Sequence, residues 1–575
     1  MARCKKAHTR DKRTKEAGDQ FCGTAALLTG CSPDAGVTVT ATYDYVIVGA
    51  GSAGCVLAHR LSSDPNVQVL LVEAGGPDKS PLIRMPRALA RVMGNADYIW
   101  PFTTQAEHQS NDTGEFWTRG RTLGGSSAIN GMMYVRGHAF DFDDLAGFAG
   151  ADWNWQHVGA AYKALESHEL GAAATRGDRG PLHISLPVER SALSDDLIAA
   201  CTGMGMQRTD DVNDPAPSER VGYAQWNIHR GRRQSAAEAF LKPVRSRKNL
   251  TVQTHQTADK LLFDGRRVSG VQCMREGATT QFLARREVIL CAGTLASPAI
   301  LQRSGIGPAA HLRQLGIPVI ADNPAIGDNL HEHRGIVMQW SAPDRASENR
   351  DYRGAGLLAS LAKYFLAHRG PMTKAAFDIG AWFKSRPDLP RPDGQILLSP
   401  FSFDYTSASP RVEPGGGVIC CLYMLRPQSS GLVRVKSTDP AALPTITPNY
   451  GSVDADNALM VNMMRYVRRL AAQPALARYG LKETRPGPQF ESDAELREAH
   501  RKMGYTNYHA VGTCRMGTDA DSALDPTLNV RGVSGVRVVD GSIFPFMPAG
   551  NTNGPVIAAA WRAADLIQAR AGSPA

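Results

Sequence analysis

A glycine-rich turn near residue 50 carries the clearest chemical signal in the sequence. It has the spacing Gly49-x-Gly51-x-x-Gly54, it follows the apolar run 43–48, and apolar residues at helical spacing continue from it to Leu61. In such a turn the first glycine permits a tight bend, the second lets the backbone approach a pyrophosphate, and the third lets the helix pack on the strand. The helix start offers free N–H groups and a partial positive charge, so this turn predicts a bound dinucleotide.

An acidic residue lies where a dinucleotide needs one. A second apolar run, 67–72, ends at Glu73, which lies 73 − 54 = 19 residues after Gly54. A carboxylate at this distance can accept hydrogen bonds from the two hydroxyls of a ribose. The order of strand, turn, helix, strand and acid predicts a Rossmann-like fold, with Ser52, Ala53 and Ala74 also beside the cofactor. The motif alone does not choose between FAD and NAD.

Three longer segments resemble the glucose–methanol–choline (GMC) family of FAD-dependent oxidoreductases, in the manner of its bacterial choline-dehydrogenase-like and alcohol-dehydrogenase-like members. Residues 120–131 resemble the first family signature and residues 293–307 the second, while residues 507–517 resemble the segment of the catalytic histidine. The resemblance extends over about 42–570. It implies that FAD is the cofactor and that an alcohol is oxidised to the aldehyde or ketone.

The resemblance also implies the catalytic residues. His509 matches the catalytic histidine of the family, and a histidine with a pKa near neutrality suits removal of a hydroxyl proton. Asn551 matches the second catalytic position, where it can hold the substrate oxygen by a hydrogen bond. Some members attach FAD covalently through a histidine at the position that Ile129 occupies here, so we expect non-covalent FAD. His331 and His333 are separated by one residue and could share a face of a strand. Two histidines are few ligands for a metal ion, so no metal is expected.

Further cofactor contacts are expected from the same resemblance and from the local sequence. Small residues at 124–127 let a loop lie against a flat ring. The run 287–293 reads as a strand that ends in a glycine turn, at the sheet edge where ligands bind. A helix over 555–569 could point its N-terminus at the flavin. The residues expected at FAD in these segments are Gly125, Ser126, Asn130, Gly131, Met132, Ala258, Ala292, Asp540, Gly541, Thr552 and Asn553.

The expected fold is α/β (α+β overall), with a Rossmann-like FAD-binding domain and a discontinuous substrate domain built on an antiparallel sheet with helices. We expect a disordered or targeting extension at 1–41. The FAD-binding domain is expected at 42–155, 215–335 and 515–570, and the substrate domain at 156–214 and 336–514. Two smaller features have plain interpretations: Cys420-Cys421 as packing within a buried strand, and Arg232-Arg233 as solvated charges.

Composition limits the classes of function. The chain has 575 residues, 43% of them hydrophobic, and a formal charge of +9. Residues 1–20 hold seven basic and three acidic residues, so 7 − 3 = +4 of that charge lies in the first 20 residues. The remaining chain is mildly basic and has no nucleic-acid-binding motif, so a nucleic-acid partner is not expected. No apolar run approaches the length of a transmembrane helix. A cytoplasmic enzyme is expected, with peripheral membrane association and export by a weak N-terminal signal as alternatives.

The alternatives to an alcohol dehydrogenase come from the same family resemblance. Electrons could pass to a quinone or another carrier, as we expect, or to oxygen in an alcohol oxidase. A lyase or a light-driven decarboxylase would be a non-redox flavin enzyme on the same fold. The decarboxylases lack the catalytic histidine and carry a cysteine before an Arg-Pro pair. Here His509 is present and Leu425 precedes Arg426-Pro427, which disfavours a decarboxylase.

Overall fold

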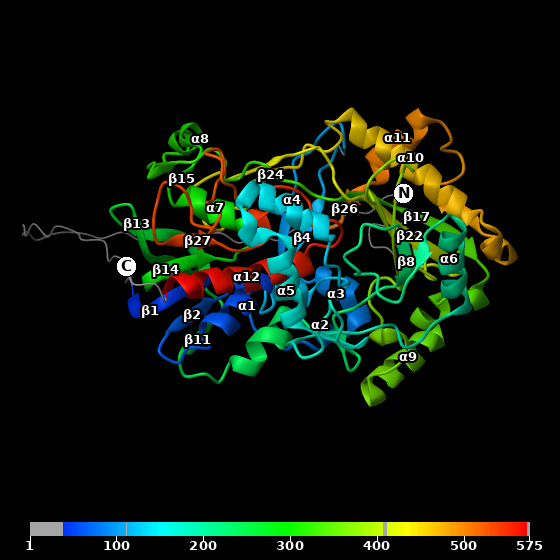
Figure 1. Cartoon of the computed structure of the whole chain (residues 1–575), viewed down its shortest axis with the longest axis horizontal. Helices are drawn as coiled ribbons and strands as arrows, with labels where there is room; N and C mark the ends of the chain where they lie inside the picture. The colour runs from blue at the N-terminus through cyan, green and yellow to red at the C-terminus, as the bar shows by residue number, and fades with distance from the viewer. Residues whose placement is uncertain (1–37, 111, 406–410, 572–575) are drawn as a thin grey trace, which may run out of the picture.

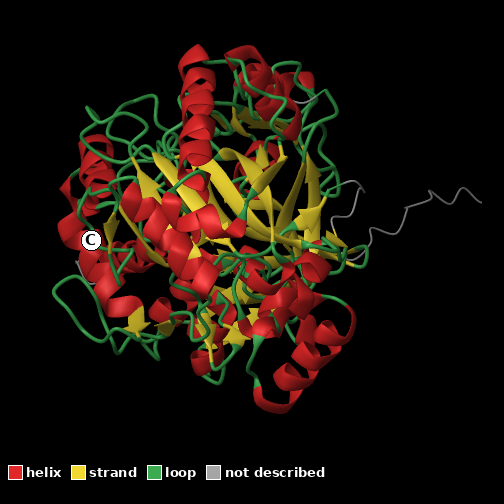
Figure 2. Ribbon diagram, turned by 90° about the vertical axis from the view of Figure 1, so that its right-hand side faces the viewer, coloured by secondary structure: helices red, strands yellow, loops and turns green. Residues whose placement is uncertain are grey.

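The computed structural model of the chain describes residues 38–110, 112–405 and 411–571. The extension expected at 1–41 lies outside the described residues except for 38–41, which form the start of the first strand. Figure 1 shows the chain running from a sheet at the left, near its C-terminus, to a second group of strands and helices at the right. The sheets lie in the interior with helices around them (Figure 2).

The first sheet carries the dinucleotide fold. Its strand order is β11-β2-β1-β14-β13-β12, and β27 also pairs with β14. Strands β11, β2, β1, β14 and β27 are parallel, whereas β12, β13 and β14 form an antiparallel meander. The strands are β1 (Thr38–Val48), β2 (Val69–Val72), β11 (Leu250–Gln253), β12 (Thr257–Asp264), β13 (Arg267–Arg275), β14 (Ala278–Leu290) and β27 (Val536–Val538).

Parallel strands buried on both faces read as continuous apolar runs, and the sequence shows such runs at the centre of this sheet. Val46, Ile47 and Leu70 are fully buried. Helices α1 (Ser52–Leu61) and α12 (Asn553–Ala571) pack against each other over the sheet (Figure 1). The strands expected at 43–48, 67–72 and 287–290, and the helices after Gly51 and over 555–569, are confirmed.

The second sheet has the strand order β25-β17-β22-β19-β18-β8-β7, with β26 paired to β17. All of its pairs are antiparallel except β7 with β8. Its strands are β7 (Gln207–Arg208), β8 (Arg220–Tyr223), β17 (Arg334–Ala342), β18 (Ile379–Phe383), β19 (Gly394–Ser399), β22 (Gly416–Met424), β25 (Lys482–Arg485) and β26 (Tyr505–Thr506). The expected combination of a Rossmann-like sheet with a mainly antiparallel sheet is confirmed.

The two faces of the second sheet meet different surroundings. Cys420 and Leu422 of β22 belong to a core shared with helices α6 (Ala192–Gly203), α10 (Asp454–Ala471) and α11 (Asp493–Met503). Cys421 and Tyr423 belong to a separate cluster on the opposite face. This alternation follows from the two-residue period of a strand. Both cysteines are buried free thiols, as the packing interpretation expects, but Cys421 also borders a cavity described below.

Shorter elements connect the sheets and position loops. They are α2 (Pro81–Arg84), α3 (Leu89–Met93), β3 (Ile99–Thr103), β4 (Phe116–Gly120), α4 (Ala139–Ala149), α5 (Trp155–Leu165), α7 (Ala296–Arg303), α8 (Ala309–Gln314), α9 (Gly354–Ala367), β23 (Leu432–Arg434) and β24 (Thr445–Thr447). One strand qualifies the expected domain boundaries: β8 lies within 215–335, yet it pairs with β18 of the second sheet. The division into domains stays a prediction. In the described part of the chain, no helix combines the length and apolarity needed to cross a bilayer.

Candidate active site

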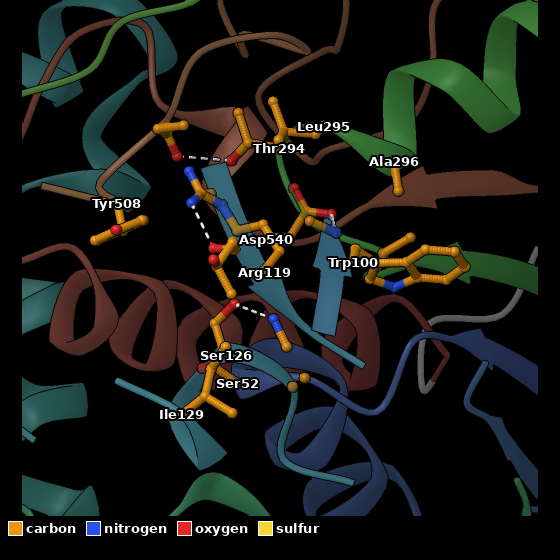
Figure 3. A pocket seen from close by; sticks show the side chains of 18 of the residues that line it. Ser52, Trp100, Arg119, Ser126, Ile129, Thr294, Leu295, Ala296, Tyr508 and Asp540 are labelled. Carbon is orange, nitrogen blue, oxygen red and sulfur yellow. Dashed lines mark hydrogen bonds between the residues drawn. The ribbon is translucent and has the colours of Figure 1, made fainter. Parts of the chain in front are cut away.

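One cavity of about 410 Å³ gathers the residues that the sequence singled out. Every predicted catalytic and cofactor residue except Gly54 lines this cavity, from Glu73 and Ala258 to His509 and Asn551. Gly54 lies behind it, where a Cβ atom would stand only 1.9 Å from the carbonyl oxygen of Gly49. That distance accounts for a glycine at this position, because the start of α1 packs directly on the turn. In Figure 3, Ser52, Ser126 and Ile129 lie together, and Tyr508 and Trp100 lie on opposite sides of the view.

The glycine turn leaves an open cradle at the start of α1. Gly49 has φ of +104°, a conformation that other residues rarely adopt. A Cβ atom on Gly51 would have only the carbonyl oxygen of Cys291 as a neighbour among the described residues, at 4.0 Å. Gly51 is the N-cap of α1, and no side chain in the described structure caps that helix start. Free N–H groups beside open space fit a pyrophosphate.

A second helix start meets the first at this cradle. The Ser52 hydroxyl of α1 donates a hydrogen bond of 2.7 Å to Oδ1 of Asn553, the first residue of α12. Thr552 and Asn553 line the same cavity. Two helix N-termini therefore direct their partial positive charge at one region, which favours a group that carries negative charge.

Glu73 occupies the position expected for an acid that holds a ribose. Its two carboxyl oxygens accept hydrogen bonds of 2.9 Å from the N–H groups of Ala50 and Gly75. Burial raises the pKa of Glu73 to about 7, although these backbone hydrogen bonds oppose the shift. Each oxygen retains a lone pair that a ribose hydroxyl can use.

The loop at 124–127 presses against the glycine turn. A Cβ atom on Gly125 would stand 2.7 Å from the Cα atom of Gly51, and Gly125 itself has φ of +52°. Ser126 accepts a hydrogen bond of 3.1 Å from the N–H of Gly120. Beyond this loop, Oδ1 of Asn130 accepts from the N–H of Met132 at 3.0 Å. The chain thus brings backbone rather than bulky side chains to the cavity wall.

Arg233 corrects the interpretation of Arg232-Arg233 as solvated charges. Arg232 is exposed, but Arg233 is only 2% exposed. Its guanidinium donates to the carbonyl oxygen and Oδ1 of Asn130 at 2.5 and 2.9 Å, and to the carbonyl oxygen of Ile83 at 3.0 Å. The two arginines lie on a short strand, so their side chains point in opposite directions. Arg233 therefore fixes the backbone of the segment expected to contact flavin.

Asp540 and Gly541 line the cavity, and the carboxylate of Asp540 is held by hydrogen bonds from the protein. Oδ2 accepts from the N–H of Gly293 at 2.8 Å and from the hydroxyl of Ser297 at 2.6 Å. Oδ1 accepts from the N–H and the hydroxyl of Ser542. Four hydrogen bonds satisfy the carboxylate, which joins the turn after β14 to the turn after β27.

His509 lies in the cavity wall next to Asn551, and a second histidine stands behind it. Nε2 of His509 is 3.0 Å from Nδ2 of Asn551, and its Nδ1 is 3.0 Å from Nδ1 of His333. Nε2 of His333 is 3.0 Å from the carbonyl oxygen of Leu425. Oδ1 of Asn551 is buried and has no hydrogen-bond partner among the described residues. These atoms form a row from Leu425 to the cavity.

The protons in this row follow from what each partner can accept. A carbonyl oxygen only accepts, so Nε2 of His333 carries the hydrogen that points at Leu425. In a neutral imidazole the other nitrogen is then the acceptor, so Nδ1 of His333 accepts from Nδ1–H of His509. Nε2 of His509 is therefore left with a lone pair, which accepts from the amide of Asn551. The row assigns the basic nitrogen of His509 to the side that faces the cavity.

Burial keeps both imidazoles neutral. It lowers the pKa of His333 to about 4. It also lowers the pKa of His509 well below the ordinary value of 6.5, and the neighbouring His333 and Arg119 add to the shift. The sequence led us to expect a base with a pKa near neutrality, whereas burial of the ring lowers the pKa of His509 below its ordinary value.

An ion pair lies behind His509. Glu332 accepts a hydrogen bond of 2.8 Å from the N–H of His509, and its other oxygen is 3.6 Å from the guanidinium of Arg119. Burial raises the pKa of Glu332 to about 7, and Arg119 opposes that shift.

Sequence reasoning missed the roles of His333, Glu332 and Arg119. The alternation His331-Glu332-His333 was the available signal, since it places two of these residues next to each other on an extended segment. Among the residues the structure describes, no group of three or more metal-ligating side chains occurs.

The donor set of the cavity fits FAD. The open cradle at Gly51 and the two helix starts suit a pyrophosphate, Glu73 suits a ribose, and the loop at Gly125 and Ser126 offers a flat wall. Ile129 has no atom that could form a covalent bond to the cofactor. FAD bound without a covalent link therefore agrees with the residues present.

Comparisons with known proteins agree with this site. Two models of the GMC oxidoreductase family match residues 43–335 and 427–560. The chain is 37% identical to oxygen-dependent choline dehydrogenase 1 of Chromohalobacter salexigens, over 93% of this chain and 96% of that protein. It is also 37% identical to alcohol dehydrogenase [acceptor] of Pseudomonas putida, over 91% of this chain and 95% of that protein.

Solved structures show the same fold. Pyridoxine 4-oxidase from Mesorbium loti has a TM-score of 0.82 and 31% identity, over 92% of this chain and all of that one. Formate oxidase of Aspergillus oryzae, in a structure concerned with FAD modification, has a TM-score of 0.86 and 26% identity, over 93% of this chain and 99% of that one. Because two family models match residues 43–335 and 427–560, and the relatives align over more than nine-tenths of the chain, this protein belongs to the GMC oxidoreductase family and is an FAD-dependent enzyme that oxidises alcohols.

Proposed function

We propose that His509 is the base that takes the hydroxyl proton of an alcohol, and that Asn551 holds the alcohol oxygen. The observation that supports these roles is the row His333–His509–Asn551, which directs a lone pair on Nε2 of His509 toward the cavity. FAD, when bound, supplies the acceptor for the hydride that leaves the carbon. The product is the aldehyde or ketone.

The protein residues divide the work as follows. The substrate hydroxyl replaces the Asn551 amide as the donor to Nε2 of His509. The Asn551 amide can then donate to the substrate oxygen, which gains negative charge as its proton leaves. Nδ1–H of His509 stays hydrogen-bonded to His333 after the ring becomes charged, so the proton remains on His509 until product departs. Glu332 accepts the backbone N–H of His509 and so holds that residue in place.

The experiment is anaerobic mixing of the purified flavoprotein with a panel of primary alcohols, followed by flavin absorbance. We expect the wild-type flavin to be bleached, and His509→Ala to keep its FAD but to be reduced about 100- to 10,000-fold more slowly. His108→Ala is the matched control, because the side chain of His108 is 95% exposed. If His509→Ala were reduced at the wild-type rate, its assignment as the base would be wrong.

For the electron acceptor we propose a quinone or another carrier rather than oxygen. The name of the Pseudomonas putida relative, alcohol dehydrogenase [acceptor], supports this choice. After the anaerobic reduction, addition of a soluble quinone is expected to restore the flavin colour faster than addition of air. Faster recovery with air would favour the alcohol oxidase.

We also propose a cytoplasmic enzyme that associates peripherally with a membrane through helix α9. Leu358, Phe365 and Leu366 on this helix are 70%, 61% and 87% exposed. Residues 354–367 contain no acid, and the exposed Lys363 and Arg369 lie beside the apolar side chains. An exposed apolar helix face with flanking cations suits an anionic lipid surface.

A further inference from the structure

The inference concerns the charge of the substrate and rests on the proposed oxidation of an alcohol. Among the described residues that line the cavity, the only carboxylates belong to Glu73 and Asp540. Asp540 accepts four hydrogen bonds from the protein, and Glu73 lies at the dinucleotide turn and accepts from Ala50 and Gly75. Neither acid is available at the reacting end of the cavity, beside His509.

One wall of the cavity near His509 is uncharged. It comes from the cavity-facing side of the second sheet, where Leu397 of β19 pairs with Cys421 of β22. Sγ of Cys421 lies 3.0 Å from the hydroxyl of Tyr505 and 3.1 Å from Oδ1 of Asn507. Burial raises the pKa of Cys421 to about 12, so the thiol stays protonated. The other residues of this wall are Met132, Met133, Ala376 and Phe377.

The buried charges near His509 are already paired with one another. Glu332 faces Arg119 at 3.6 Å, and Glu115 faces Arg334 at 3.3 Å. His333 and His509 are neutral because burial lowers the pKa of each. A cationic substrate would therefore lose its hydration without gaining a carboxylate partner, which is costly in a buried site.

Two of the aromatic rings that line the cavity, those of Trp100 and Tyr508, already have arginines over them. The guanidinium of Arg121 is 4.7 Å from the ring centre of Trp100, and that of Arg119 is 6.0 Å from the ring centre of Tyr508. These guanidinium groups take up the attraction of the rings for cations and repel a second positive charge. Trp153 and Trp155 lie elsewhere: Trp153 is fully buried and donates to the carbonyl oxygen of Pro526, and Trp155 packs beside Phe142.

We propose that the substrate is an uncharged alcohol with an apolar body, and that the site selects against choline and other quaternary ammonium alcohols. The absent counter-charge, the uncharged wall and the occupied ring faces lead to this conclusion together. On this proposal the chain acts on a different class of substrate from the choline dehydrogenases to which it is similar.

The test uses two alcohols of the same shape. Choline and 3,3-dimethylbutan-1-ol differ only in a positively charged nitrogen in place of a carbon. Binding of each to the His509→Asn holoenzyme, which is not expected to oxidise them, is followed by the flavin difference spectrum. We expect the neutral alcohol to bind at least about tenfold more tightly. Equal binding, or tighter binding of choline, would overturn the inference.

A matched pair of variants tests the cause. Cys421→Asp adds one carboxylate to the wall, whereas Cys421→Asn adds an uncharged group of nearly the same size. We expect Cys421→Asp to lower the preference for the neutral alcohol by at least about tenfold relative to Cys421→Asn. The same preference in both variants would contradict the electrostatic explanation.

Reduction of the wild-type flavin by the two alcohols separates this inference from the proposed function. If choline bleached the flavin faster than its neutral isostere, alcohol oxidation would stand and the inference would fall. If no alcohol in the wider panel bleached the flavin, the proposed function would fall, and the binding comparison alone would decide the charge preference.

Discussion

At the scale of single residues, the protonation of His509 depends on a side chain that never reaches the cavity. His333 is fully buried, and its only role in the row is to accept Nδ1–H of His509 while donating to Leu425. Without that acceptor, His509 could place its hydrogen on Nε2 and lose its lone pair toward the substrate. His333 is therefore a positioning residue that acts through His509.

Replacement of His333 should lower turnover without loss of FAD. In His333→Leu, no group accepts from Nδ1 of His509, and we expect kcat to fall by about 10- to 100-fold with little change in KM. In His333→Gln, a carbonyl oxygen can accept the same hydrogen, and part of the activity should return. Steady-state kinetics and the FAD-to-protein absorbance ratio measure both effects. Equal loss in the two variants would indicate a role in packing alone.

The pH dependence of kcat/KM provides a second test of the row His333–His509–Asn551. The neutral form of His509 is the base, and its lowered pKa keeps it neutral well below pH 6.5. We therefore expect kcat/KM to be constant across neutral pH and to decrease only as the pH falls through that lowered pKa. An inflection at the ordinary histidine pKa of 6.5 would show that the buried environment does not set the basicity.

The role of a residue could be predicted from the sequence where it depends on neighbouring residues in the chain. It could not be predicted where it depends on a contact with a distant residue. Gly49, Gly51 and Glu73 act through a continuous local segment, so their positions were predictable. The prediction for Arg233 was wrong because, of the two adjacent arginines, Arg232 faces the surface and Arg233 faces the interior. His333 meets His509 from 176 positions away along the chain, and no local pattern records that contact.

At the scale of elements, the approach of two turns defines the cofactor cradle. The 3-10 turn at Gly125–Ala128 lies against the glycine turn of α1, and Gly125 allows that approach. A side chain on Gly125 would collide with Gly51 and would also force an unfavourable φ. Backbone contact at this point leaves the cavity open on its other sides.

Gly125→Ala is expected to weaken FAD binding. Its Cβ atom would lie 2.7 Å from Cα of Gly51, so one of the two turns must shift. We expect at least a tenfold increase in the Kd for FAD, equivalent to about 1.4 kcal/mol, measured by quenching of flavin fluorescence on titration of apoprotein. Gly147→Ala is the control, since Gly147 lies in α4 with no atom within 4 Å of a Cβ position. Unchanged FAD affinity in Gly125→Ala would show that the approach is not required.

Helices and strands that depend on neighbouring residues could be predicted from the sequence. Pairings between strands that lie far apart in the sequence were harder to predict. The β1–α1–β2 unit and α12 follow from local periodicity, because each buries one continuous apolar stretch. Strand β8 reads like part of the same run of strands as β11, yet it pairs with β18 about 160 residues later in the chain. The register of antiparallel strands depends on long-range packing that periodicity does not specify.

At the scale of the whole molecule, α9 packs on the segment that leads into the cavity-lining helix α3. Tyr364 of α9 belongs to a buried cluster with Met85, Ala88 and Met372. The helix α3 follows this cluster directly, and its Leu89 and Met93 line the cavity. In Figure 1, α9 extends away from the body of the molecule on the side of α2 and α3. The exposed apolar side chains of α9 thus lie on a helix that packs beside a cavity-lining element.

The triple variant Leu358→Ser, Phe365→Ser, Leu366→Ser should lose membrane binding while it keeps flavin reduction by alcohols. Each apolar side chain contributes roughly 1.5–3 kcal/mol when it leaves water, so the loss of three should abolish binding to vesicles of equal phosphatidylcholine and phosphatidylglycerol. Flotation of the holoenzyme with these vesicles measures the membrane binding. High salt should weaken binding of the wild type, because Lys363 and Arg369 contribute through charge.

The double variant Val188→Ser, Phe116→Ser is the control, since these exposed apolar residues lie outside α9. If the triple variant floated like wild type, α9 would not be the membrane contact. If it instead changed the oligomer size in solution, a second copy of the chain would be what covers this helix.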